Sequence, residues 1–204
     1  MQKIIINGCM NYIKNNTKYD DIKLKEIKYG LESIYLTFTK IFIIIALSLI
    51  FGIFKSVIIY MVIYNILRTP SFGLHATKSW ICLLSSTILF IGIPCLCLYI
   101  KIPIYIKVII GIIGIILMYK NSPADTYKRP IVNKKRRLIY KYISVLFTII
   151  YSFLGILIQN GFLSNCFILS IIMQNFMISP IVYKLFGLPY NNYITFLKNH
   201  PEFN

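Results

Sequence analysis

The sequence predicts an all-α polytopic membrane protein, and three observations support this: composition, the grouping of apolar residues and the placement of charge. Of the 204 residues, 57% are apolar and 14% are charged, whereas a soluble domain has roughly a quarter charged residues. The mean hydropathy is +0.71. Several apolar blocks approach the roughly 20 residues that a helix needs to cross the hydrocarbon core. These blocks cover residues 41–54, 56–67, 81–100, 102–119, 142–158 and 162–183.

We therefore expect one integral membrane domain that spans residues 1–204. It would contain an amphipathic N-terminal segment (1–30), about six transmembrane helices (31–183) and a cytoplasmic tail (184–204). In this arrangement no water-soluble part is large enough to have a core of its own.

The N-terminal segment has the spacing of an amphipathic helix. Ile6, Met10 and Ile13 follow one another at helical intervals, with lysines and asparagines between them. After an interruption at 15–17, a second apolar stripe runs from Leu24 to Phe38 into the first span. We expect a helix in the membrane interface that bends into the bilayer. The alternative is a frayed, solvated tail.

Lys55 interrupts the apolar sequence after the first span, which covers about 35–54. One long helix over 41–67 would place this lysine near the middle of the membrane. A hairpin would place it at the far surface, where its ammonium can snorkel to water. We favour the hairpin, although its second arm, 56–67, is short for a full crossing.

The remaining spans follow in order. The third runs from about 77 to 100, and the fourth follows a turn at 101–103 and ends at 119. The fifth covers about 138–158. After a turn at 159–161, the sixth covers about 162–183, and the sequence 186–189 ends the helical pattern.

The net charge of +16 is distributed asymmetrically between the loops. With six spans and both termini in the cytoplasm, only Lys55, Lys101 and Lys107 lie outside, as the positive-inside rule requires. The positive charge therefore fits a multi-pass protein of the cell membrane. No aromatic and basic platform on a soluble fold indicates nucleic-acid binding, so we expect no nucleic-acid partner.

A short polar island at 68–82 separates two apolar blocks and contains His75 and Cys82. A polar cluster at the edge of a span is costly and indicates a function. A cysteine and a histidine are the minimum that nucleophilic acyl chemistry requires, and the working hypothesis is a membrane-embedded cysteine endopeptidase. The alternative is that the two residues are unrelated. The cytoplasmic side is reducing, so Cys82 would remain a free thiol.

The spacing of His75 and Cys82 restricts their geometry. On one straight helix, seven residues rise about 10.5 Å, which is too far for a hydrogen bond. If the two residues cooperate, a helix must begin between them, with Cys82 in its first turns and His75 on the preceding loop. No acidic residue lies nearby in sequence to orient His75. The candidates are hydroxyls and an amide, namely Ser79, Ser85, Ser86, Thr87 and the more distant Gln174.

We expect no metal and no cofactor, because zinc requires three or four ligands and His75 and Cys82 have no evident companions.

Two motifs in this sequence resemble those of the accessory gene regulator B (AgrB) family. The first is Arg68-x4-Gly73-x-His75-Ala-x5-Cys82. The second is Ser122-Pro-Ala-Asp-Thr-Tyr-Lys-Arg-Pro130, followed by a basic run, which resembles the family's "APADT…RP" loop between spans four and five. Length, span count and the basic N-terminus fit as well, so the resemblance covers nearly the whole chain.

The resemblance implies a bacterial membrane cysteine peptidase with its active site on the cytoplasmic side. It would cleave a small amphipathic precursor peptide and promote its cyclisation to an autoinducing peptide for quorum sensing. By this analogy Cys82 is the nucleophile, His75 is the general base and acid, and Gly73 shapes the loop. Arg68 matches a residue that the family needs. The resemblance also implies a homodimer in the lipid bilayer.

The resemblance gives the basic loop a substrate-binding role, because the family's precursor has an acidic C-terminal segment. The expected binding residues are Lys128, Arg129, Lys134, Lys135, Arg136 and Arg137. The alternative is that these charges only determine topology.

Three residues, Pro123, Asp125 and Pro130, are expected to give the loop its structure. Asp125 would pair with Arg129 or another loop cation, or else cap a helix near Ser122 and Pro123.

Two other classes of function remain open. One is a transporter or export component, and the other is a non-catalytic membrane interaction protein. Both predict that replacing Cys82 with alanine leaves function unchanged, whereas the peptidase interpretation predicts complete loss of cleavage.

Overall fold

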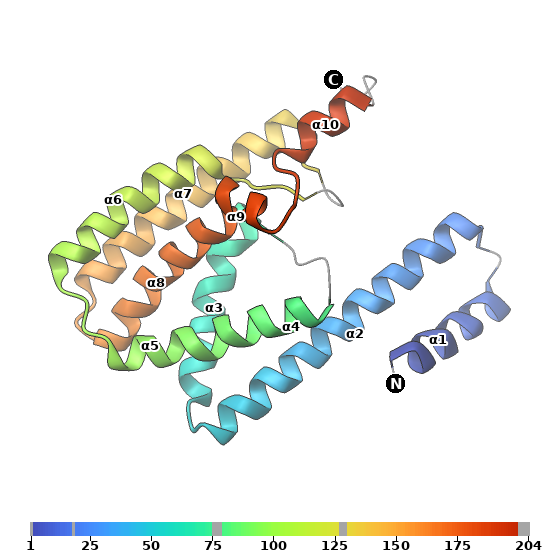
Figure 1. Ribbon diagram of the computed structural model, residues 1–204, viewed down its shortest axis with the longest axis horizontal. Coiled ribbons are helices and arrows are strands. Elements are labelled where there is room, and N and C mark those ends of the chain that lie inside the picture. The colour runs from blue at the N-terminus through green and yellow to red at the C-terminus, as the bar shows by residue number, and fades with distance from the viewer. Residues whose placement is uncertain (1, 18, 75–78, 127–129, 200–204) are drawn as a thin grey trace.

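The computed structural model describes residues 2–17, 19–74, 79–126 and 130–199. In these ranges the chain is built from helices (Figure 1), and five helical stretches are long and apolar enough to cross a membrane. The all-α polytopic membrane fold is thus confirmed. The expected count of about six spans is reached only if α3 is added to these five.

The N-terminal segment forms two helices, α1 (Gln2–Asn16) and α2 (Asp21–Ile50). Ile6 and Met10 of the predicted apolar stripe are buried, and α1 packs against α2. The second stripe lies within α2, which is continuous up to Ile50. The sequence therefore predicted both the amphipathic helix and the break that follows it.

The expected hairpin at Lys55 is confirmed. The helix α2 ends at Ile50, Gly52 turns the chain with a φ of 68°, and α3 (Phe54–Ser71) begins with Lys55 in its first turn. The second arm is longer than 56–67, because α3 continues to Ser71 and includes Pro70.

The third span consists of three consecutive segments. These are α4 (Ser79–Thr87), the π-helical turn η1 (Ile88–Gly92) and α5 (Ile93–Tyr99). Pro94 lies just after the π turn and has no backbone N–H to donate, which accounts for an irregular hydrogen-bond ladder at this point.

The helices α6 (Ile104–Asn121), α7 (Lys134–Leu157) and α8 (Gly161–Ile178) pack side by side, with α3 against them (Figure 1). Small residues allow this close approach, as is common between membrane helices. A Cβ atom added at Gly114 would clash with the Ile171 side chain, and one added at Gly155 would lie 2.6 Å from Ile168.

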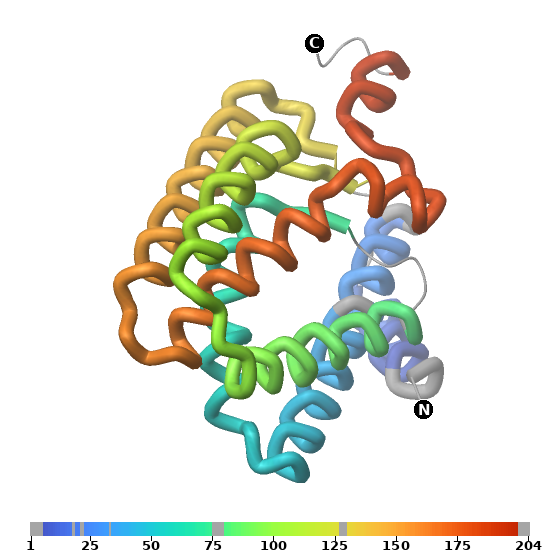
Figure 2. The backbone as a smooth tube through the Cα atoms, turned by 60° about the vertical axis from the view of Figure 1, so that its left-hand side comes forward, coloured from blue at the N-terminus to red at the C-terminus, as the bar shows by residue number. Residues whose placement is uncertain are grey.

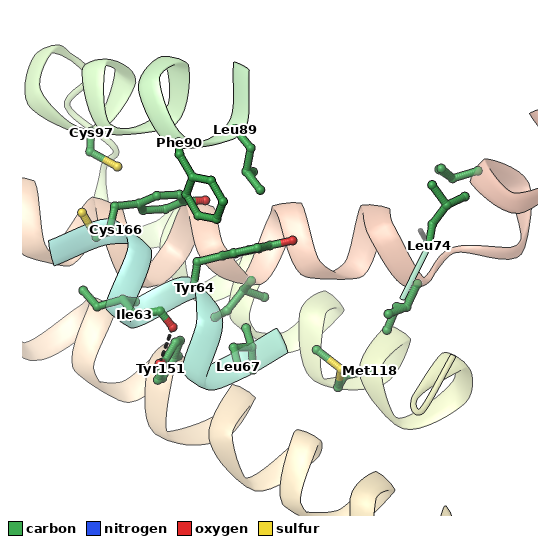
Figure 3. Packing of buried hydrophobic residues seen from close by; sticks show 14 of the residues in the cluster. Ile63, Tyr64, Leu67, Leu74, Leu89, Phe90, Cys97, Met118, Tyr151 and Cys166 are labelled. Atoms are coloured by element: carbon green, nitrogen blue, oxygen red, sulfur yellow. Dashed lines mark hydrogen bonds between the residues drawn. The ribbon is translucent and has the colours of Figure 1, made fainter. Parts of the chain in front are cut away.

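Buried polar side chains also join these helices. Asn165 donates to the carbonyl groups of Cys97 (3.1 Å) and Ile100 (2.6 Å). In the core, Tyr60, Tyr64 and Phe90 form contacts between aromatic rings, and the Tyr151 hydroxyl donates to the Ile63 carbonyl at 2.7 Å (Figure 3). Since lipid provides no hydrogen-bond partners, such internal bonds are required within a membrane.

Two predicted boundaries were wrong. The fifth span was expected to begin near 138, but α7 begins at Lys134, because the Asn133 side chain accepts a hydrogen bond from the Arg136 amide at 3.0 Å and caps the helix. The basic run 134–137 is therefore the first turn of a helix and not a loop.

The sixth span was expected to be continuous over 162–183, but α8 ends at Ile178 and α9 (Pro180–Leu185) follows. Pro180 cannot continue the hydrogen-bond ladder. The polar tail contains a further helix, α10 (Asn192–Asn199).

The view in Figure 2 separates two parts of the molecule. The bundle of α6, α7 and α8 lies on one side, and α1 with α2 lies on the other. The rod of α4, η1 and α5 connects them, since it packs against α2 through α4 and against α8 through α5. The start of α4 therefore lies beside α2.

Candidate active site

The connection between α3 and α4 is fixed at its first residues by backbone hydrogen bonds. The Ala124 amide donates to the Ser71 carbonyl at 3.1 Å, and the Gly73 amide donates to the Ala124 carbonyl at 3.0 Å. The Leu74 amide donates to the Met177 carbonyl at 3.1 Å. This segment therefore joins the two sequence motifs, around 68–82 and 122–130, to each other and to the end of α8.

Glycine is required at position 73 for two reasons. Its φ of 123° lies in a region that other residues rarely adopt. A Cβ atom there would also lie 3.2 Å from the Met177 carbonyl oxygen. The predicted role of Gly73 in shaping the loop agrees with this geometry.

Arg68 supports the same loop from α3. One of its guanidinium nitrogens donates to the Tyr64 hydroxyl at 2.9 Å, and the other donates to the Leu74 carbonyl at 3.2 Å. Arg68 thus holds the residue that directly precedes His75. The sequence indicated Arg68 only through the resemblance to a family motif, and these contacts show that it supports the loop.

Gln174 is fully buried on α8, and its amide nitrogen donates to the Phe72 carbonyl at 2.8 Å. Gln174 was a candidate for orienting His75. The structure places it against the backbone three residues before His75, which itself lies outside the described residues.

Cys82 is half-buried in the first turn of α4, which begins at Ser79. This start lies between His75 and Cys82, where cooperation between the two residues would need a helix to begin. Ser85 and Thr87, also candidates for orienting His75, donate instead to carbonyl groups of α4, at 3.2 Å to Cys82 and 2.9 Å to Leu83.

The sequence did not predict the contact between Lys40 and Cys82. The Lys40 ammonium on α2 lies 4.0 Å from the Cys82 sulfur. The two residues are 42 positions apart, and neither periodicity nor motif spacing indicated that they meet.

Asp125 belongs to the second motif, is buried, and joins this motif to the C-terminal tail. Its carboxylate accepts hydrogen bonds from the backbone amides of Asn192 (3.0 Å), Tyr193 (2.8 Å) and Ile131 (3.4 Å). It therefore caps the start of α10 and not a helix near Ser122, which was the alternative to pairing with a loop cation. The other expected partner, Arg129, lies outside the described residues.

The two prolines frame this loop. The peptide bond between Ser122 and Pro123 is cis, and Pro123 is buried, while Pro130 is half-buried just before α7. The loop 122–125 is thus held at the same end of the bundle as residues 71–74.

A basic pocket of about 540 Å³ opens beside this loop. It is lined by cations from α6 and α7 and by tyrosines of the tail: Lys120, Lys134, Arg137, Lys141, Tyr190 and Tyr193. The Arg137 guanidinium lies 3.3 Å from the centre of the Tyr193 ring, which holds the tail against α7. Burial raises the pKa of Tyr190, so this phenol is neutral near pH 7.

Only part of the predicted basic set lines this pocket. Lys134 and Arg137 do, whereas Lys135 and Arg136 are exposed and are not among the lining residues. Lys128 and Arg129 lie outside the described residues. Lys120 and Lys141 belong to the pocket although neither was predicted as a site residue. A helical periodicity applied to 134–141 would have placed Lys134, Arg137 and Lys141 on one face.

Metal ligation finds no support in the part of the chain that the structure describes, where no group of three or more histidine, cysteine or acidic residues could hold an ion. Cys97 and Cys166 are buried in the core as free thiols.

The fold and the site together define a polytopic helical membrane protein with a half-buried thiol at a helix start and a basic pocket at the end of its bundle. The family model described as "Accessory gene regulator B" matches residues 6–178. The chain belongs to this family.

Individual relatives agree with this assignment. A putative AgrB-like protein of Clostridium acetobutylicum is 30% identical over 184 residues, covering 90% of this chain and 88% of the relative. A putative AgrB-like protein of Listeria monocytogenes is 30% identical over 182 residues, covering 88% of each chain. The accessory gene regulator protein B of Staphylococcus aureus is 26% identical over 180 residues, covering 87% of this chain and 94% of the relative. No solved structure gives a significant match.

Proposed function

We propose that this protein is a membrane-embedded cysteine endopeptidase that matures a quorum-sensing peptide. It removes the C-terminal segment of a small amphipathic precursor and promotes cyclisation to a thiolactone or lactone autoinducing peptide. One observation carries the proposal: α4 begins between His75 and Cys82, while Arg68 and Gly73 fix the backbone immediately before His75.

The chemistry begins with proton transfer from the Cys82 thiol to His75. The Cys82 sulfur attacks the carbonyl carbon of the scissile peptide bond, forming a C–S bond as the C–N bond breaks. The His75 imidazolium returns the proton to the departing amine, so the acidic segment leaves as a free amine and a thioester to Cys82 remains. A Cys or Ser side chain of the bound peptide then attacks this thioester, closes the ring and releases the thiol.

Ring closure competes with hydrolysis of the same thioester. Exchange between two thiols is nearly neutral in energy, so the acyl-enzyme retains the energy of the broken bond. Cys82 is half-buried beside α2, and partial burial at the membrane edge limits access of water.

The basic pocket is the proposed binding site for the acidic segment of the precursor. It presents Lys120, Lys134, Arg137 and Lys141 to one cavity, and several cations around one cavity favour carboxylates. The competing role, topology determination alone, requires no cavity. The protein acts in the cell membrane as a homodimer, with the site and both termini on the cytoplasmic side.

The test is a cleavage assay in liposomes with the precursor peptide, in which the masses of peptide and enzyme are followed. Wild-type protein is expected to give a cleaved peptide and a covalent adduct, and Cys82→Ala is expected to give neither. Cys95→Ala is the matched control, because Cys95 is a half-buried thiol of the same span. Cleavage by Cys82→Ala would overturn the peptidase proposal and favour a transport or interaction role.

The form of the product tests ring closure separately. A purified wild-type enzyme that releases only the linear peptide would remove the cyclisation step and leave the endopeptidase in place.

A further inference from the structure

Lys40 is a charged residue within an apolar span. It lies on α2, in the candidate span Lys23–Ile50, and it is half-buried. Ionisable residues at such positions are costly and usually interact with a specific partner. For Lys40 that partner, among the described residues, is the Cys82 sulfur at 4.0 Å.

The hydrogen-bonding capacity of the two groups decides the direction of this contact. A lysine ammonium has three donors and no acceptor. In a favourable contact the ammonium therefore donates and the Cys82 sulfur accepts. The thiol proton of Cys82 must then point away from Lys40. A positive charge at this distance also favours negative charge on the sulfur.

We propose that Lys40 is the electrostatic partner of the Cys82 nucleophile, holding its sulfur in the attacking orientation and stabilising the charge that forms on it. The inference rests on the proposed function, because Cys82 is the nucleophile only there. Lys40 takes no proton, since an ammonium has no lone pair, and that role stays with His75. The start of α4 acts in the same direction, because a helix N-terminus also favours an anionic sulfur.

The inference makes α2 a part of the active site. The part of the site around Gly73 is built from α3, α8 and the loop 122–125. The orientation and charge of the Cys82 sulfur would instead depend on Lys40 of α2. The N-terminal helices then do more than anchor the protein, because a displacement of α2 would move the charge away from the sulfur.

Alkylation of Cys82 by two reagents of different charge tests this without any precursor. Iodoacetate is an anion and iodoacetamide is neutral, and both react with the same sulfur. In detergent micelles, the rate ratio of iodoacetate to iodoacetamide at Cys82 would be measured by mass spectrometry of the modified peptide. Cys9, which is exposed on α1, is the internal reference for each reagent.

At Cys82, this ratio is expected to be roughly fivefold higher in the wild type than in the Lys40→Gln variant. The reason is that a unit charge about 4 Å away attracts an anion by about 1 kcal/mol in a high-dielectric setting. Lys40→Arg keeps the charge and should retain most of the ratio. Lys55→Gln removes the same charge from the exposed first turn of α3 and should change nothing. An unchanged ratio in Lys40→Gln, in protein that still elutes as folded, would overturn the inference.

The cleavage assay then separates this inference from the proposed function. Lys40→Gln should slow adduct formation with the precursor, and Lys40→Arg should restore it. If Cys82→Ala still cleaves, the proposed function fails, although the alkylation ratio would still report the charge beside Cys82. If wild type cleaves and Lys40→Gln cleaves equally fast, only the role of Lys40 fails.

Discussion

The two ends of the connection between α3 and α4 are held very differently. Ser71, Gly73 and Leu74 are buried, and residues 71–74 are bound through their backbone to Ala124 and to α8, whose candidate span is 50% buried. Cys82 lies on α4 and contacts Lys40 of α2, and the candidate span of α2 is only 12% buried. The side of the candidate site that leads to His75, the fixed side, is therefore held by the bundle, whereas the side with Cys82 lies beside a helix with few buried residues.

Among the variants that test this comparison, the largest effect is expected from Gly73→Ala, which strains the backbone of the fixed side directly. Alanine must adopt a φ of 123° and meet the Met177 carbonyl at 3.2 Å, at a cost of about 1–3 kcal/mol for the backbone conformation. Since the adjacent residues lead to His75, we expect cleavage to fall by at least about tenfold, a change of roughly 1.4 kcal/mol in activation free energy.

The control for this variant is Gly52→Ala. Gly52 also has a positive φ, 68°, but no atom lies within 4 Å of its added Cβ. It should reduce thermal stability modestly and leave cleavage intact. If both variants lost cleavage equally, general instability would explain the result and the fixed side would have no special role.

Arg68 tests the same side through its side chain. Arg68→Lys keeps the charge but cannot bridge the Tyr64 hydroxyl and the Leu74 carbonyl with one planar fork. We expect about a tenfold lower rate of adduct formation, with precursor binding little changed. Tyr64→Phe removes only one of the two contacts and should cost less. A larger loss in Tyr64→Phe than in Arg68→Lys would contradict this ordering.

Asp125 tests how far the fixed side extends. Asp125→Asn replaces a charged acceptor of three backbone amides with a neutral amide, and each hydrogen bond to a charged group contributes about 1.5–3 kcal/mol. Faster amide exchange in α10 is expected, with a smaller increase at Gly73. Unchanged exchange in α10 would show that Asp125 does not hold the tail.

The smallest effect is expected in the basic pocket, where several cations would contribute to binding the precursor. Arg137→Glu should raise the KM for the precursor about threefold to tenfold, because Arg137 lines the cavity. Lys135→Glu makes the same change in charge on the same helical turn but at an exposed position outside the lining. Equal effects from both variants, with topology intact, would indicate a diffuse field and not a pocket.

Local patterns allowed much of the fold to be predicted. The lengths of the apolar runs predicted the positions of the spans, and the charge at Lys55 predicted the hairpin. The rise of a helix over seven residues predicted that a helix begins between His75 and Cys82 if the two residues cooperate. The start of α7 was missed because four cations in a first helical turn oppose the helix dipole and are more typical of a loop.

Long-range partners could not be predicted in the same way. Asp125 meets the amides of α10 across 67 positions, and Lys40 meets Cys82 across 42. Hydrophobic periodicity reports which face of a helix is buried but not which helix covers it. The candidate functional residues were predicted from the motifs, and the structure adds how Arg68 and Gly73 are placed.

The capping of α10 by Asp125 has a practical consequence for handling this protein. A truncation before Asn192 would take two amide donors from a carboxylate that is 2% exposed and leave it, among the described residues, the Ile131 amide at 3.4 Å. A buried charge that loses partners is destabilising. The neighbouring residue Ala124 is hydrogen-bonded to both Ser71 and Gly73, so the damage would spread toward the segment 71–74. Purification tags are therefore better attached beyond α10 than in place of it.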